Sequence, residues 1–406
     1  MKRKILYISM CMPFDNAFHA GGKTFNYYIN SFANDDNNEV TLITKVLPEE
    51  EKYIHTINPK INALFVATSK NKIRKYVNYF KSLNSKVNPL YPYGNVLTKD
   101  IFNQIENKLK YLKSINYCPD VIILEWTWML LFIDKVKSYF PDARYVASEH
   151  DVSFLGLKRR ADNSKFFLQR LKNKLYYKNI KNKELSSIEK CDFVVTHNEK
   201  DKKLLINNGI ARDKVGVITP YFEKQELIER KSNHRDIVFY GAMNRIENSG
   251  AALWFINNVL PKLSNIDIRF VIVGNKPPEK LLRLQNDRII CTGFVEKIQP
   301  FFSEAMCVVA PLQEGAGIKV KILEAMSMGA PVLTNDIGIE GIDAIDGEHF
   351  LYCREAEDYV KIIENIYYGR IDADVIGRNA VEMMKEKYNL NRSFKKYSDR
   401  VYSLIK

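Results

Sequence analysis

Cysteine is scarce in this 406-residue chain, and its pattern excludes two classes of protein. The six cysteines are scattered, with no C-x-x-C pair and no Cys/His cluster of zinc spacing. A disulfide scaffold and a zinc-binding module are therefore not expected. We expect buried, reduced thiols in a cytoplasmic protein.

Long hydrophobic runs are also missing. The apolar stretch VIILEWTWMLLFI has about a dozen residues and contains Glu125, whereas a membrane-spanning helix needs about 20. The opening MKRKILYISMCMPF is basic and then apolar, but it has no small-residue cleavage site. It predicts a first β-strand and not a signal peptide. We expect no transmembrane segment.

Acidic residues are in deficit, and only in one half of the chain. Lys and Arg number 61 against 48 Asp and Glu, a net charge of +13. Residues 1–235 carry +15, whereas residues 236–406 carry −2. With 46% hydrophobic residues the chain is typical of a globular protein. The charge asymmetry predicts two domains with different partners.

Strand-like and helix-like segments alternate in two successive series, which predicts βαβ units and parallel sheets. We therefore expect an α/β fold of two doubly wound, Rossmann-like domains facing a cleft. The expected parts are a first domain over 1–220, a linker over 221–235, a second domain over 236–388 and a C-terminal helix over 389–406 that crosses back to the first domain. Strands are expected at 4–10, 39–44, 120–126, 143–150, 191–198, 236–242, 267–275, 288–295, 307–311 and 330–334. Helices are expected at 21–34 and at 248–263, the latter with Asn248 as a candidate N-cap.

Glycines follow the expected strands of the second series. Ligands of open α/β sheets bind beyond the carboxyl ends of the strands, and glycine lets backbone N–H groups approach an anion there. A tight turn explains one such glycine. Several along one sheet edge indicate a nucleotide site, and these are Gly241, Gly274, Gly293, Gly315 and Gly317.

The stretch EGAGIKVKILEAMSMGAPVLTND combines this glycine pattern with charge. Lys319 and Lys321 stand at the start of an expected helix, where cations oppose the helix dipole. A bound diphosphate would explain them, and so would a solvated surface. Glu324, on the same helix, could accept two ribose hydroxyls or pair with Lys321 at i, i+3.

Here the residues carry a resemblance. GAGIKVKILEAMSMGAPVLTNDIGIEGI resembles the donor-binding segment of the retaining glycosyltransferases of family four, which have the two-Rossmann GT-B architecture. FYGAMNRIENSGAALWFINNVLP resembles the start of their second domain, CTGFVEKIQPFF their base-binding turn, and ASEHDVSFLGLKRR a first-domain segment with a His-Asp pair. The likeness covers most of residues 236–342 and is patchy before them.

The resemblance implies a nucleotide-diphospho-sugar in the second domain. Glu324 would hold the ribose, the backbone around Phe294 and Val295 the base, and Lys319 with Lys321 the diphosphate. Ala316 stands where much of the family has a first Glu, and Glu314 lies nearby in another register. The expected catalytic residues are His150, Lys319 and Glu324. The expected donor-binding residues are Gly22, Gly241, Asn244, Arg245, Gly274, Phe294, Val295, Gly315, Gly317 and Lys321.

Two features of the first domain have competing interpretations. HAGGKTF ends like a phosphate-binding P-loop, but Ala17 occupies the position of the required first glycine, so we expect a glycine turn facing the cleft. His150 ends an expected strand between Glu149 and Asp151. A functional and a structural role are equally compatible with that position.

A metal site is not expected. The D-x-D stretch DAD at 372–374 lies in a helical, surface-like segment. We therefore expect neither a catalytic metal nor another cofactor.

Two basic stretches, 69–86 and 157–183, mix Lys and Arg with Phe, Tyr and Leu. They could be solvated helix faces or helices on an anionic membrane surface. Nucleic acid is not expected, since no recognition motif accompanies them.

The sequence thus predicts a retaining glycosyltransferase that moves a sugar from a UDP- or GDP-sugar to an acceptor hydroxyl. The expected acceptor is a saccharide or lipid-linked saccharide, in bacterial surface polysaccharide or lipid-linked oligosaccharide synthesis at the inner face of the cytoplasmic membrane. Two alternatives stay open: a nucleotide-sugar epimerase of GT-B shape, and a non-catalytic basic adaptor that binds membrane or polyanion.

Overall fold

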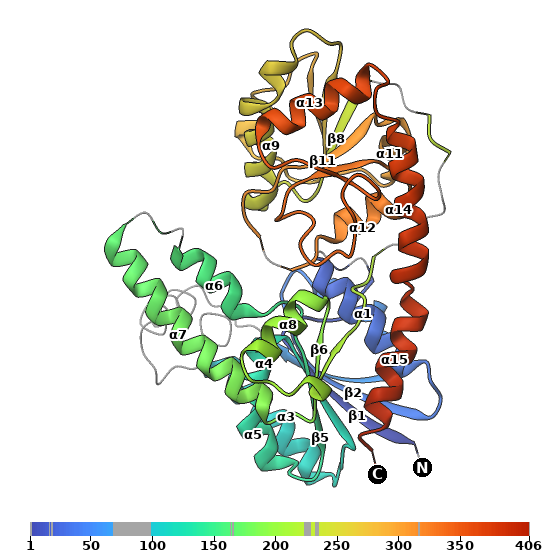
Figure 1. Cartoon of the computed structure of the whole chain (residues 1–406). Coiled ribbons are helices and arrows are strands. Elements are labelled where there is room, and N and C mark those ends of the chain that lie inside the picture. The colour runs from blue at the N-terminus through green and yellow to red at the C-terminus, as the bar shows by residue number, and fades with distance from the viewer. Residues whose placement is uncertain are drawn as a thin grey trace. The chain divides into compact units, whose positions relative to one another are not determined.

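A computed structural model describes residues 2–15, 17, 19–67, 99–162, 164, 166–222, 229–231, 235–315 and 317–405. The basic stretch 69–86 lies outside the described residues, as do Ala316 and parts of the expected linker, 223–228 and 232–234. The chain divides into two units (Figure 1). The first unit comprises Met1–Tyr221 and Leu390–Lys406, and the second comprises Phe222–Asn389.

The first unit is built on a parallel sheet with the strand order β3-β2-β1-β4-β5-β6-β7. Its central strands are apolar on both faces because helices cover both sides, as the fully buried β4 illustrates. The order reverses between β1 and β4, where such sheets bind ligands. The strands are β1 (Arg3–Ser9), β2 (Asn38–Val46), β3 (Ile61–Ala67), β4 (Val121–Glu125), β5 (Arg144–Ser148), β6 (Phe193–Thr196) and β7 (Val215–Val217).

Helices surround this sheet, and the last helix of the chain is one of them (Figure 1). Tyr397 of α15 packs edge-on against Tyr28 and Phe32 of α1, and Val401 is fully buried in the same core. The helices of this unit are α1 (Ala20–Ala33), η1 (Glu51–Thr56), α3 (Lys99–Ser114), α4 (Trp126–Leu130), α5 (Ile133–Tyr139), α6 (Ser153–Asp162), α7 (Phe167–Glu189), α8 (Glu199–Asn207), η2 (Arg212–Lys214) and α15 (Leu390–Tyr402).

The second unit repeats the plan with the parallel order β10-β9-β8-β11-β12-β13. Phe255 of α9 stacks on Phe270 of β9 in its core. The strands are β8 (Asp236–Tyr240), β9 (Arg269–Val273), β10 (Ile289–Gly293), β11 (Cys307–Ala310), β12 (Val332–Thr334) and β13 (Leu351–Tyr352). The helices are α9 (Ile246–Asn258), η3 (Leu260–Leu263), α10 (Glu279–Leu282), α11 (Gln299–Glu304), α12 (Val320–Ser327), α13 (Ala356–Tyr367) and α14 (Ala373–Lys387).

The predicted α/β fold with two Rossmann-like parallel sheets is confirmed. Two local predictions are wrong. The N-cap of α9 is Arg245 and not Asn248, whose side-chain amide donates to the Ala242 carbonyl at 2.9 Å. The strand expected at 120–126 ends at Glu125, because Trp126 has a φ of 65° and begins α4. Within the ranges described above, no helix is both long and apolar enough to span a membrane.

Candidate functional site

The strand ends of the second unit approach one another closely at two glycines. A Cβ on Gly274 would lie 1.7 Å from the Gly241 carbonyl oxygen, so only glycine fits there. The Gly241 N–H donates to Val273, and the Gly274 N–H donates to Gly293. These two N–H groups therefore hold the strand ends together, and the glycines serve close packing.

Three cations gather beside these strand ends. Lys321 donates to Asn248 Oδ1 at 2.6 Å, and its ammonium lies 4.8 Å from the centre of the buried Phe239 ring. Lys319 is the N-cap residue of α12, where its ammonium donates to the Gly317 carbonyl and lies 3.8 Å from Glu340. Arg245, in the loop before α9, pairs with Glu247.

The pKa of Lys321 reflects its burial and the charges around it. Burial lowers the pKa of Lys321 to about 7, and the neighbouring cations Lys319 and Arg245 lower it further, whereas Glu247 opposes them. The fold therefore places an ammonium where its charged form is disfavoured. An anion would restore the charged form, because an opposite charge within about 4–6 Å favours it.

The other expected donor-site residues occupy varied positions in this unit. Gly315 adjoins Lys319, whose Cε would lie 3.2 Å from a Cβ added there. Glu324 is buried on α12, only 8% exposed. Phe294 is 74% exposed at the end of β10, next to the half-buried Val295. Asn244 is exposed in the loop after β8.

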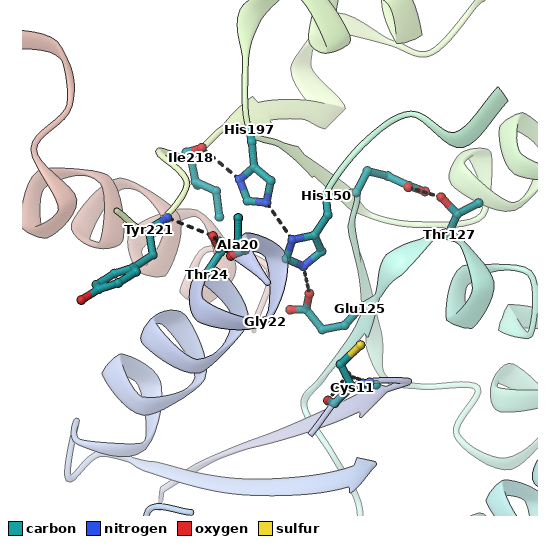
Figure 2. A network of polar contacts seen from close by, with 12 residues as sticks. Cys11, Ala20, Gly22, Thr24, Glu125, Thr127, His150, His197, Ile218 and Tyr221 are labelled. Atoms are coloured by element: carbon teal, nitrogen blue, oxygen red, sulfur yellow. Dashed lines mark hydrogen bonds and ion pairs between the residues drawn. The ribbon is translucent and has the colours of Figure 1, made fainter. Parts of the chain in front are cut away.

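In the first unit, polar groups meet at the carboxyl ends of β4, β5 and β6 (Figure 2). His150 Nε2 lies 2.9 Å from Glu125 Oε2, and His150 Nδ1 lies 3.2 Å from His197 Nε2. The His150 ring stacks on Trp126 with 4.1 Å between the ring centres. His150 and Glu125 are 7% and 4% exposed, so the group is shielded from water.

Burial is the largest cause of the pKa shifts in this group. It raises the pKa of Glu125 to about 8, and it lowers the pKa of His150 and of His197 to about 3. Burial therefore favours the neutral form of all three side chains. Sequence reasoning missed Glu125 and His197, although a carboxylate inside an apolar run and a histidine directly after a strand were visible.

Gly22 lies in the first turn of α1, in this same unit. Its N–H donates at 2.9 Å to Nδ1 of His19, the N-cap residue. A Cβ on Gly22 would lie 3.1 Å from that of Ala17. The glycine thus permits a tight entry into the helix.

The Asp-Ala-Asp stretch has a structural explanation. The Asp372 carboxylate accepts from the backbone N–H groups of Asp374 and Val375 and so caps α14. Asp374 pairs with Arg230 at 2.6 Å. Over the described part of the chain, no group of three or more His, Cys, Asp or Glu residues could hold a metal ion.

Comparison with known proteins finds a family likeness in the second unit. Residues 234–368 match the family model described as glycosyl transferases group 1. An uncharacterised glycosyltransferase of Methanocaldococcus jannaschii is 24% identical over 388 residues, which cover 87% of this chain and 91% of that protein. An uncharacterised 44.6 kDa protein in the cps region of Klebsiella pneumoniae is 25% identical over 284 residues, 62% of this chain and 72% of that protein.

Solved structures share the fold over almost the whole chain. A sucrose-phosphate synthase from Thermosynechococcus elongatus has a TM-score of 0.69 at 14% identity and covers 99% of both chains. The Anabaena protein HepE in complex with UDP has a TM-score of 0.64 at 12% identity, covering 98% of this chain and all of that one. These likenesses show the GT-B fold. The match to the glycosyl transferases group 1 model and the Methanocaldococcus relative confirm the prediction of a glycosyltransferase.

Proposed function

We propose that this glycosyltransferase takes its sugar from a nucleoside-diphosphate donor, either a UDP- or a GDP-sugar, and transfers it with retention. The observation that carries the proposal is the cation cluster of Lys319, Lys321 and Arg245 within the glycosyl transferases group 1 domain. A diphosphate is the anion that suits three cations at the N-terminal ends of α9 and α12. The Anabaena neighbour, which was solved with UDP, supports a nucleotide of this class.

The chemistry follows from where charge develops. As the glycosidic bond breaks, negative charge grows on the departing diphosphate. Cations already in place stabilise that charge without reorganisation. Lys319 and Lys321 would supply this stabilisation, and the buried carboxylate of Glu324 would hold the ribose hydroxyls. In a retaining reaction the acceptor attacks from the side that the diphosphate leaves, so a diphosphate oxygen can take its proton.

A thermal-shift screen tests the donor class. UDP or GDP should raise the melting temperature of the wild-type protein, because a ligand that binds only the folded state stabilises it. Incubating the matching nucleotide-sugar with and without saccharide acceptors should then show acceptor-dependent nucleotide release, and the anomeric configuration of the product reports retention. Failure of every nucleoside diphosphate to shift the melting temperature contradicts the proposal.

We further propose a surface-polysaccharide or lipid-linked acceptor at an anionic membrane. The Klebsiella relative, which is described as lying in a cps region, supports the surface-polysaccharide acceptor. The anionic membrane is proposed from the surface of α7 and the residue before it. Phe166, Phe167 and Leu168 are 73%, 78% and 78% exposed, although soluble proteins rarely expose a contiguous apolar patch without a partner.

The spacing of residues on α7 favours a lipid surface as that partner. Leu168, Leu171 and Leu175 recur at i, i+3 and i+7, so they form one stripe, and the last two are 49% and 56% exposed. The exposed cations Arg170, Lys172, Lys174 and Lys178 flank this stripe. An exposed apolar stripe beside cations is the feature by which interfacial helices bind anionic headgroups.

Co-sedimentation with vesicles tests this surface. Binding should need anionic lipid and weaken with salt. The double variant Phe167→Ser/Leu168→Ser should lose binding, and so should reversal of Lys158, Arg159, Arg160, Lys172 and Lys174 to Glu, while both keep the nucleotide thermal shift. Ile115→Ser is the matched control, since Ile115 is 52% exposed on the same unit. If the variants pellet like the wild type, α7 is only a solvated helix.

A further inference from the structure

Three side chains of the first unit form an unbroken line of hydrogen bonds that ends at a carbonyl (Figure 2). It runs from Glu125 to His150 at 2.9 Å and from His150 to His197 at 3.2 Å. The last link joins His197 Nδ1 to the Ile218 carbonyl oxygen at 3.2 Å. The members come from the ends of β4, β5 and β6 and from the residue after β7.

When all three side chains are neutral, the carbonyl at the end sets the direction of every bond. A carbonyl oxygen can only accept, so His197 Nδ1 carries a proton. A neutral His197 then has a lone pair on Nε2, to which His150 Nδ1–H donates. A neutral His150 therefore has its lone pair on Nε2, and Glu125 must donate to it as a carboxylic acid.

The same bonds permit two other arrangements, and all three contain the same number of protons. Moving the proton from Glu125 to His150 gives a carboxylate beside an imidazolium. Moving a second proton along gives a carboxylate, a neutral His150 and a cationic His197. An ionised Glu125 with two neutral histidines cannot make every bond, because two acceptors then face each other at one link. The line is complete only when it holds one extra proton.

The surroundings favour the arrangement without charges. Besides the two histidines, the side chains around Glu125 carry no positive charge. They are Ser148 and Glu149 at the end of β5, Tyr7 of β1, Cys11 after β1, and Tyr397 of α15. Glu149 itself has a pKa raised to about 8 by burial. A charge placed on Glu125 would therefore be buried without a fixed cation near it.

We propose that Glu125 is a neutral carboxylic acid at pH 7 and acts, together with His197, as a positioning residue that fixes His150 as its Nδ1–H tautomer. With both ring nitrogens engaged, His150 does not serve as a general base. Its ring instead supports the entry to α1: a Cβ on Gly21 would lie 3.3 Å from His150 Nδ1 and 3.4 Å from Trp126. The inference rests on the proposed function only for its effect on turnover.

Nitrogen-15 NMR of the histidine rings in the intact protein tests the proton positions without any substrate. At pH 7, His150 should give a protonated Nδ1 and an unprotonated Nε2, and His197 the same. Raising the pH through about 8 should change the His150 signals as Glu125 ionises. A protonated His150 Nε2 at pH 7 would overturn the proposal.

Substitutions separate positioning from plain stability. Glu125→Gln keeps a donor opposite His150 Nε2 and cannot ionise, so it should retain the tautomer and abolish the change near pH 8. Glu125→Leu, which lacks a donor, should lose the fixed tautomer. Glu149→Gln is the control: it is equally buried and accepts from Thr127 at 2.5 Å, outside the line. At pH 7 this variant should leave the His150 signals unchanged.

Turnover supplies a second readout. Glu125→Gln should keep kcat at pH 7 within about threefold, whereas Glu125→Leu should lower it by about tenfold or more. If the NMR result holds and neither variant changes turnover, the tautomer is fixed but His150 is not part of the reaction site. If no donor is turned over by the wild type, the proposed function fails and the proton assignment still stands.

Discussion

The two units place polar side chains at the same structural location, the carboxyl ends of parallel strands, but they treat charge in opposite ways. In the first unit, Glu125, His150 and His197 bond to one another and are neutral at pH 7. In the second, burial together with the neighbouring cations Lys319 and Arg245 lowers the pKa of Lys321 to about 7. Neutral, mutually bonded groups fix geometry, whereas crowded cations favour an anionic ligand.

The largest effect is expected from removing a cation of the second unit. Lys319→Ala should lower kcat about 100-fold, because the lysine stabilises charge that grows in the transition state. Steady-state rates with the donor found in the screen measure this effect. Lys280→Ala, an exposed lysine of α10, should change little. A loss confined to nucleotide affinity, with kcat kept, would mean that Lys319 only binds.

A smaller effect is expected from the buried carboxylate of α12. Glu324→Ala should weaken UDP or GDP binding by about 1.5–3 kcal/mol, the range for hydrogen bonds to a charged group. Isothermal titration and the thermal shift both measure this loss. Glu382→Ala, at an exposed position of α14, serves as the control. Unchanged nucleotide affinity in the Glu324 variant would remove this residue from the ribose site.

Nucleotide affinity should also depend on pH through Lys321. Its pKa is about 7 in the free protein, and a bound diphosphate should raise it. Binding then takes up a proton above pH 7, and affinity should fall by up to about tenfold per pH unit. Titration in buffers of different ionisation enthalpy measures this uptake.

Lys321→Met should bind nucleotide more weakly and without proton uptake. The same change should stabilise the free protein at pH 7. A lysine whose folded pKa is lowered disfavours folding at every pH below its unfolded pKa, because the unfolded chain holds the proton more tightly. Proton uptake by the variant equal to that of the wild type would contradict the assignment to Lys321.

The sequence predicts the cation cluster of the second unit better than it predicts the bonded histidines of the first unit. In the second unit, local order predicts that Lys319, the N-cap residue of α12, lies close to Lys321 and Glu324 of that helix, and the glycine pattern before it marks a strand end. It does not predict that Arg245 joins them. In the first unit the bonded groups are 25 and 47 residues apart. Alternating strands predict that such residues share a sheet edge, but not which side chains face one another.

The wrong boundaries have local physical causes. Trp126 extends an apolar run, which favours a strand, yet it takes a left-handed backbone and starts α4. Asn248 has the side chain of a good N-cap, but it lies inside α9, where its amide bonds Ala242 and its oxygen accepts from Lys321. Tertiary contacts override the capping preference there. The two-residue strand β13 is too short to leave a periodic pattern.

The smallest effect is expected from removing metal ions. Among the residues that the structure describes, no three or more His, Cys, Asp or Glu side chains are grouped so that they could hold Mg²⁺ or Mn²⁺. In the first unit, Glu125 is a neutral acid that donates to His150. In the second, the cations that gather beside the strand ends would repel a metal ion and neutralise the diphosphate themselves. EDTA should therefore leave kcat unchanged within about twofold. Full loss of activity that is restored by Mn²⁺ would show that a metal shares the diphosphate with Lys319 and Lys321, and the Lys319→Ala variant should then lose much less than 100-fold.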